Sequence, residues 1–206
     1  LVCAVTQPEF NYGFADRFLL ATSLSQLPLI MVLNKMDLSE QIPEEISDFL
    51  SLVDCFIPVS CASGLGLEEL RATLSGRFSV FSGQSGVGKS SLINALVPGA
   101  RLRTGSVRAK DGKGRHTTTA SSLFMLPQGG AVIDTPGIRA LGLVNLAPAE
   151  LARCFPGFFP EGLFTCRFND CLHRNEPGCS VLEGVRSGRI SSARWRSYLR
   201  ILNSGD

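Results

Sequence analysis

Apolar runs bounded by turn-forming residues recur along the chain and predict six β-strands. The runs cover about 1–6, 29–34, 56–59, 78–82, 121–126 and 131–135. Between several of them, apolar residues spaced three and four apart predict helices at 43–52, 67–75 and 89–97. Strands that alternate with helices indicate an α/β fold with a mostly parallel sheet and helices on both faces.

The pattern changes after about residue 146. A short helix is expected at 148–155, and a stretch rich in Gly, Pro, Phe, Cys and His follows it. One or two basic helices are expected over 181–202. We therefore expect two domains, residues 1–146 and a small helical domain, residues 147–206.

Composition narrows the class of protein. The 206 residues are 44% hydrophobic and 18% charged, which allows a packed core and excludes disorder by composition. The net charge of +2 predicts no strong overall attraction to nucleic acid. No run of 18 apolar residues is present, so we expect no membrane span. The chain begins inside an apolar run without a methionine, and we expect an N-terminal segment to precede it.

A phosphate-binding loop is predicted where the strand at 78–82 meets the helix at 89–97. The segment fits G-x-x-x-x-G-K-[ST], whose glycines let backbone N–H groups surround phosphates. Lysine at the seventh position reaches the β- and γ-phosphates, and the serine after it binds Mg²⁺. The nucleotide-binding residues predicted here are Gly83, Gln84, Ser85, Gly86, Val87, Gly88, Lys89, Ser90 and Ser91. A glycine-rich turn with no ligand is the alternative.

Two further motifs end strands. Asp134 to Gly137 match D-x-x-G, in which Asp134 holds Mg²⁺ through water and the Gly137 N–H senses the γ-phosphate. Asn34, Lys35, Met36 and Asp37 match N-K-x-D, in which the aspartate accepts hydrogen bonds from guanine N1 and N2 that adenine cannot donate. Ser60, Cys61 and Ala62 match the loop whose backbone N–H meets guanine O6. A polar turn is the alternative for the N-K-x-D segment.

The order of these motifs is rotated relative to ordinary GTPases, because N-K-x-D and the Ser60 loop precede the phosphate loop. Two further features are the segment K-G-R-H-T-T-T at 113–119 and a Cys/His cluster made of Cys166, Cys171, His173 and Cys179. Together with the motifs above, they make the chain resemble the ribosome small-subunit-dependent GTPase A (RsgA) family of circularly permuted GTPases. The resemblance implies GTP hydrolysis in late maturation of the small (30S) ribosomal subunit, stimulated by that subunit and its rRNA. It also implies an N-terminal oligonucleotide-binding barrel, which we expect to lie in a segment preceding residue 1 unless this member of the family lacks it.

The segment between the phosphate loop and D-x-x-G supplies the candidate catalytic residues. By resemblance Thr118, with Thr117 as second choice, coordinates Mg²⁺ when GTP is bound. Ile138 stands where many GTPases carry a water-orienting glutamine. We therefore propose that His116 positions the attacking water, the alternative being a solvated loop histidine.

A metal site is predicted near the C-terminus. Seven cysteines, an odd number, argue against a disulfide framework. Cys166, Cys171, His173 and Cys179 instead have the composition of a closed tetrahedral Zn²⁺ site, and the RsgA family carries one at matching positions. Cysteines used as apolar core residues are the alternative. Arg194, Trp195 and Tyr198 lie in a basic segment that suits either RNA contact or an ordinary helix.

Other functions remain open at this point. A permuted GTPase acting on the large ribosomal subunit is disfavoured by the Cys/His cluster, and a non-hydrolysing RNA-binding module is disfavoured by Lys89, Ser90 and Asp134. The expected ligands are GTP or GDP with Mg²⁺ and one structural Zn²⁺. The expected partners are the small ribosomal subunit and its rRNA, and no membrane. We expect a monomer in the cytoplasm, or in a plastid or mitochondrion if the source is eukaryotic.

Overall fold

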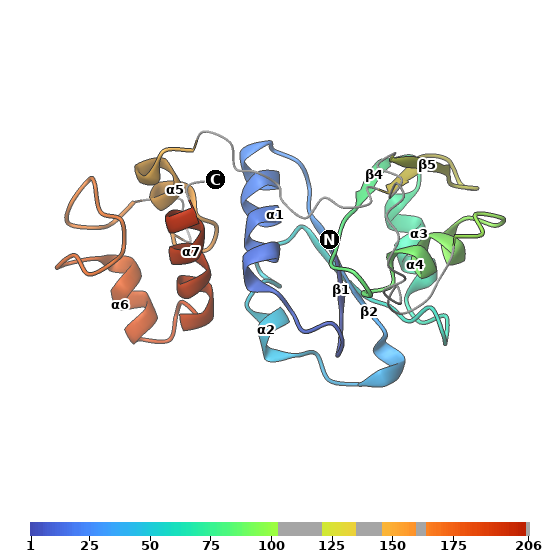
Figure 1. Ribbon diagram of the computed structural model, residues 1–206, viewed down its shortest axis with the longest axis horizontal. Helices are drawn as coiled ribbons and strands as arrows, with labels where there is room; N and C mark the ends of the chain where they lie inside the picture. The colour runs from blue at the N-terminus through green and yellow to red at the C-terminus, as the bar shows by residue number, and fades with distance from the viewer. Residues whose placement is uncertain (103–120, 135–145, 160–163, 205–206) are drawn as a thin grey trace, which may run out of the picture. The chain divides into compact units, whose positions relative to one another are not determined.

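The computed structural model describes residues 1–102, 121–134, 146–159 and 164–204 (Figure 1). These segments contain six strands and seven α-helices, and the predicted elements follow the predicted order, but the helix at Tyr12–Leu24 was not predicted. The strands are β1 (Val2–Ala4), β2 (Ile30–Asn34), β3 (Cys55–Pro58), β4 (Phe78–Phe81), β5 (Ser122–Met125) and β6 (Ala131–Asp134). The helices are α1 (Tyr12–Leu24), α2 (Glu44–Ser47), α3 (Leu67–Leu74), α4 (Lys89–Leu96), α5 (Pro148–Cys154), α6 (Ser180–Arg186) and α7 (Ser192–Ser204), with a 3₁₀ turn η1 (Met36–Leu38).

The chain divides into two compact units, and each unit is made of three separate segments of the chain. Unit 1 contains residues 1–10, 30–43 and 55–139, and unit 2 contains residues 11–29, 44–54 and 140–206. Unit 2 thus draws two internal segments together with the C-terminal part of the chain. The division into domains at residue 146 stays a prediction.

Unit 1 carries the strands. β1, β2 and β3 are parallel, and Val32 pairs with Val2 on one side and Ile57 on the other. β4 is parallel to β6, whereas β5 runs antiparallel to β6. The antiparallel pairing follows from the short turn at Leu126–Gly130, because a parallel connection needs a longer crossover. The mostly parallel α/β fold predicted from the sequence is confirmed.

The strands form two three-stranded sheets, in the orders β1-β2-β3 and β4-β6-β5, where the sequence suggested a single sheet. The two meet where the Val2 N–H donates to the Ser82 carbonyl at 2.7 Å. β4 ends at Phe81, so this bond lies just beyond the end of that strand.

The core of unit 1 forms because α3 and α4 each turn one apolar stripe inward. Leu67, Leu70 and Leu74 are buried on α3, as are Leu92, Ile93 and Leu96 on α4. These side chains pack with buried strand residues in one cluster. The cluster includes Val87 of the predicted phosphate loop, so packing holds that loop against the sheet.

Unit 2 is built around α1 and α7, which pack against each other. Leu20 of α1 and Tyr198 of α7 belong to one buried cluster together with Phe155 and Phe158. The Arg194 guanidinium donates to the Asp16 carboxylate at 2.7 Å, and both side chains are buried. Arg194 is therefore unavailable for the RNA contact considered from the sequence.

The predicted helices differ in extent from those observed. The helix expected at 43–52 is only Glu44–Ser47, and bonds between residues three apart continue through Leu52. The basic segment forms two helices, α6 and α7, separated at Gly188. Among the described residues, none of the helices has the length and apolarity that crossing a lipid bilayer requires.

Candidate nucleotide-binding and metal sites

The predicted phosphate loop lies between β4 and α4, as the motif requires. A Cβ atom at Gly83 would lie 2.3 Å from the Val2 carbonyl oxygen, and one at Gly88 would lie 2.2 Å from Asn34 Nδ2. Gly88 also has a φ of +99°, in the left-handed region that favours glycine. Ser90 and Ser91 lie in the first turn of α4, where free backbone N–H groups and the helix dipole favour an anion.

Lys89 is held inside this loop. Its Nζ donates to the carbonyl oxygens of Gly83 at 2.5 Å and Gln84 at 2.9 Å. Burial lowers the pKa of Lys89, and the nearby Asp134 charge offsets only part of this shift. Asp134 ends β6 and pairs with Phe81, the last residue of β4, so its carboxylate lies beside the start of the loop. Burial raises the pKa of Asp134 and the Lys89 charge lowers it.

Asn34 joins the predicted guanine motif to the phosphate loop. It ends β2, is 2% exposed, and its Nδ2 donates to the Val87 carbonyl at 2.9 Å. Cys61 Sγ lies 3.7 Å from Asn34 Oδ1, within hydrogen-bonding reach for sulfur. Burial, followed by the Asp37 charge, raises the pKa of Cys61 and keeps the thiol protonated as a donor. Motifs separated by about fifty residues thus lie at one place.

Ser60 fixes the Asp37 carboxylate. Its buried hydroxyl donates to Asp37 Oδ1 at 2.6 Å and accepts from the N–H groups of Ala62 at 3.2 Å and Ser63 at 3.1 Å. One hydroxyl proton and two lone pairs are therefore all engaged. Asp37 itself is exposed, so its other oxygen remains accessible to a base.

Lys35 and Met36 complete the guanine motif. Met36 begins η1, and its N–H donates to the Val59 carbonyl at 3.1 Å, which ties the motif to the end of β3. Lys35 has a φ of +68° and donates from Nζ to the Gln7 carbonyl at 2.5 Å. Gln7 was not predicted, because a backbone acceptor can be any residue type and leaves no signal in the sequence.

Some predicted site residues cannot be placed. Gly137, His116, Thr117 and Thr118 lie outside the described residues. The remaining predicted nucleotide-binding residues all belong to unit 1, at the ends of β2, β3, β4 and β6. Ligands of open α/β sheets bind at this edge, beyond the carboxyl ends of parallel strands.

The predicted metal ligands lie together in unit 2. The three Sγ atoms and the His173 nitrogen all lie within 4.8 Å of one another. His173 Nδ1 is 3.6 Å from Cys166 Sγ, 3.4 Å from Cys171 Sγ and 3.3 Å from Cys179 Sγ. Tetrahedral Zn²⁺, with bonds of about 2.3 Å to sulfur and 2.0 Å to nitrogen, holds its ligand atoms about 3.5–3.8 Å apart. The arrangement therefore fits zinc.

Surrounding groups orient these ligands. The His173 Nε2 lies 2.9 Å from the Ala152 carbonyl, an arrangement in which Nε2 donates and Nδ1 is left as the metal-binding lone pair. Burial lowers the pKa of His173, which favours the neutral imidazole that a metal needs. Cys179 caps α6 and accepts from the Leu182 N–H at 3.4 Å. No open ligand position is indicated, so the centre suits a structural role.

The chain is similar in sequence to known proteins. A family model described as RsgA GTPase matches residues 1–144. A small ribosomal subunit biogenesis GTPase RsgA from Chlorobaculum parvum is 46% identical over 212 residues, covering 100% of this chain and 67% of that protein. RsgA 1 from Vibrio vulnificus is 41% identical, covering 96% of this chain and 57% of that protein.

Solved structures resemble the chain as well. YjeQ from Thermotoga maritima has a TM-score of 0.77 at 34% identity, covering 99% of this chain and 69% of that one. YloQ, described as a circularly permuted GTPase, has a TM-score of 0.68 at 26% identity, covering 100% of this chain and 66% of that one. The chain thus spans about two thirds of these proteins.

Proposed function

This chain belongs to the RsgA GTPase family, and on that basis we propose that it binds guanine nucleotide with Mg²⁺ and hydrolyses GTP to GDP and phosphate. The observation that carries the proposal is the hydrogen bond from Asn34 to the Val87 carbonyl. Through this bond, a motif that can recognise guanine and a loop that can hold phosphates form a single site. They do so although the guanine motif precedes the phosphate loop in this chain, the reverse of the order in ordinary GTPases.

Each binding residue has a proposed role. Asp37 accepts from guanine N1 and N2, and the backbone of the Ser60 loop meets guanine O6. Lys89 exchanges its present carbonyl partners for the β- and γ-phosphate oxygens. Ser90 would hold Mg²⁺ directly and Asp134 would hold it through water, and the ion would supply positive charge that offsets the charge of the phosphates.

For the hydrolytic step we propose three further residues from the sequence. Thr118 completes the Mg²⁺ coordination, the Gly137 N–H contacts the γ-phosphate, and His116 orients the attacking water. His116→Ala should lower kcat with little change in GDP affinity, because the guanine and phosphate contacts are elsewhere. Unchanged kcat in this variant would remove His116 from the mechanism.

The partner is proposed from the names of the relatives, which are small ribosomal subunit biogenesis GTPases. We infer that this protein acts on the maturing 30S subunit and contacts its rRNA, as a monomer in the cytoplasm. We also propose that Cys166, Cys171, His173 and Cys179 bind one structural Zn²⁺, because their spacing suits its bond lengths.

Two measurements test the nucleotide proposal. Titration with fluorescent GDP and ADP should give at least about 100-fold preference for GDP, since ADP would leave the second oxygen of the Asp37 carboxylate covered by the base without a hydrogen-bond donor. Lys89→Ala should abolish binding of both. Single-turnover GTP hydrolysis should accelerate when small subunits, but not large subunits, are added. Equal affinity for the two nucleotides would reject the guanine site, and equal stimulation by both subunits would reject the partner.

A further inference from the structure

Glu176 lies in the segment between two of the proposed zinc ligands, His173 and Cys179. Its side chain closes a small loop of backbone. Oε1 accepts from the Leu172 N–H at 2.8 Å. Oε2 accepts from the N–H groups of Arg174 at 2.7 Å and Asn175 at 3.0 Å. One carboxylate therefore holds three backbone groups of the residues that flank His173.

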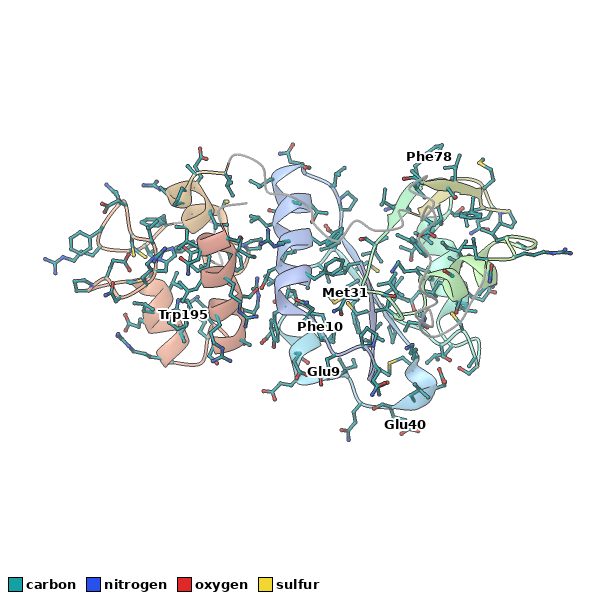
Figure 2. The ribbon with its side chains drawn as sticks, viewed as in Figure 1. Glu9, Phe10, Met31, Glu40, Phe78 and Trp195 are labelled. Carbon is teal, nitrogen blue, oxygen red and sulfur yellow. The ribbon has the colours of Figure 1, made fainter. Side chains whose placement is uncertain are left out.

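The conformation at His173 needs such support. Its φ is +57°, a left-handed backbone conformation that residues other than glycine rarely adopt. Two side chains of helix α7 support the same segment by donating to the segment's carbonyl groups. Tyr198 Oη donates to the Leu172 carbonyl and Trp195 Nε1 donates to the His173 carbonyl, both at 2.9 Å. Trp195 is labelled on this helix in Figure 2.

The two sets of contacts divide the task. The α7 side chains engage the carbonyl groups, and Glu176 engages the N–H groups, so the backbone on both sides of His173 is fixed. The imidazole is fixed separately, through Nε2 and the Ala152 carbonyl. The direction in which Nδ1 points depends on two things: the position of the His173 Cα atom and the contact between Nε2 and the Ala152 carbonyl. The backbone turn sets the position of Cα, so it also decides whether Nδ1 points toward the three thiolates.

We propose that Glu176 is a positioning residue for the metal: it is not a ligand, and it sets zinc affinity by holding the left-handed turn at His173. Both carboxylate oxygens are occupied by backbone donors, and Glu176 is not among the four residues whose ligand atoms cluster. The inference rests on the zinc site proposed above. Removing a hydrogen bond that orients a metal ligand typically weakens binding by about 10–100-fold.

Glu176→Gln tests this with little change in shape. An amide offers one oxygen and one NH₂ group, so at least one backbone N–H must face another donor. The control is Glu183→Gln, which removes the same charge from an exposed position on α6 where no hydrogen bond to the carboxylate is seen among the described residues. We expect zinc affinity, measured by competition with a chromophoric chelator, to fall about 10–100-fold in Glu176→Gln and less than about twofold in the control.

Two spectroscopic readouts separate positioning from general destabilisation. With Co²⁺ in place of Zn²⁺, Glu176→Gln should show altered d–d absorption, because the nitrogen ligand is displaced, whereas Glu183→Gln should match the wild type. In the zinc-loaded wild type, amide hydrogen exchange should be slow at Leu172, Arg174 and Asn175. This second readout needs no variant, so it stands even if Glu176→Gln does not fold.

The outcomes are distinguishable. Wild-type protein that binds no zinc would reject the metal site itself. If the wild type binds zinc, and Glu176→Gln matches it in both zinc affinity and cobalt spectrum, only the role of Glu176 would be rejected. Fast exchange at all three amides in the zinc-loaded wild type would reject it too.

Discussion

Replacing Ser60 by alanine should weaken guanine binding without touching the nucleotide directly. In the structure the Ser60 hydroxyl donates to Asp37 Oδ1 at 2.6 Å and accepts from the N–H groups of Ala62 and Ser63. Alanine removes all three bonds at a fully buried position. The Asp37 carboxylate, which we propose for guanine recognition, is then no longer held in one direction. The N–H groups of Ala62 and Ser63 also lose their common acceptor.

The magnitude follows from the environment of Asp37. A hydrogen bond to a charged group contributes about 1.5–3 kcal/mol when no solvent replaces it. Asp37 is exposed in the free protein, so water compensates in part, and we expect a loss of about 1–2 kcal/mol in binding. That corresponds to about 5–30-fold weaker binding of GDP and GTP alike.

The assay is titration with fluorescent GDP, with Ser63→Ala as the matched control. Ser63 belongs to the same loop, but it is exposed, and among the described residues its hydroxyl accepts only a long 3.4 Å bond from the Leu65 N–H. The control should bind within about twofold of the wild type, since it removes no contact to Asp37. Ser60→Ala binding within the same twofold range, in a protein that melts like the wild type, would refute the reasoning.

Three other changes should have measurable effects. Gly88→Ala should weaken GDP binding by at least about tenfold, because a left-handed residue with a side chain costs about 1–3 kcal/mol and its Cβ meets Asn34; unaltered affinity would contradict this. Arg194→Met should lower the free energy of unfolding in urea by about 3–5 kcal/mol by leaving Asp16 buried and unpaired, and adding Asp16→Leu should recover part of it. Stripping zinc with a chelator should reduce the far-ultraviolet circular dichroism of α6 and α7, and a spectrum that does not change would count against a structural metal.

The strands and the site motifs could be predicted because they depend on local chemistry. β2 and β6 are apolar runs that end in polar residues, and both begin and end within two residues of the prediction. The glycines around Lys89 are needed wherever backbone must approach phosphate, so they identify the loop without a structure. The Cys/His cluster was likewise predictable, since few other roles combine these side chains at such spacing.

Other features depend on distant partners and could not be predicted. Helix α1 was missed because its apolar residues do not form one clear stripe and because the charged Asp16 lies on its buried side. The partner that makes this burial possible, Arg194, is 178 residues away. The contacts of Ser60 and Asn34 were also missed, since they depend on how separate loops meet.

The distance along the chain between Asp16 and Arg194 has a consequence while the ribosome synthesises the protein. At about 5–20 residues per second, roughly 10–35 s pass between the emergence of Asp16 and that of Arg194. Throughout that interval the apolar residues of α1 have no helix α7 to pack against. We expect the nascent chain to need chaperone protection at this stage, and an expressed piece ending near residue 146 to aggregate for the same reason.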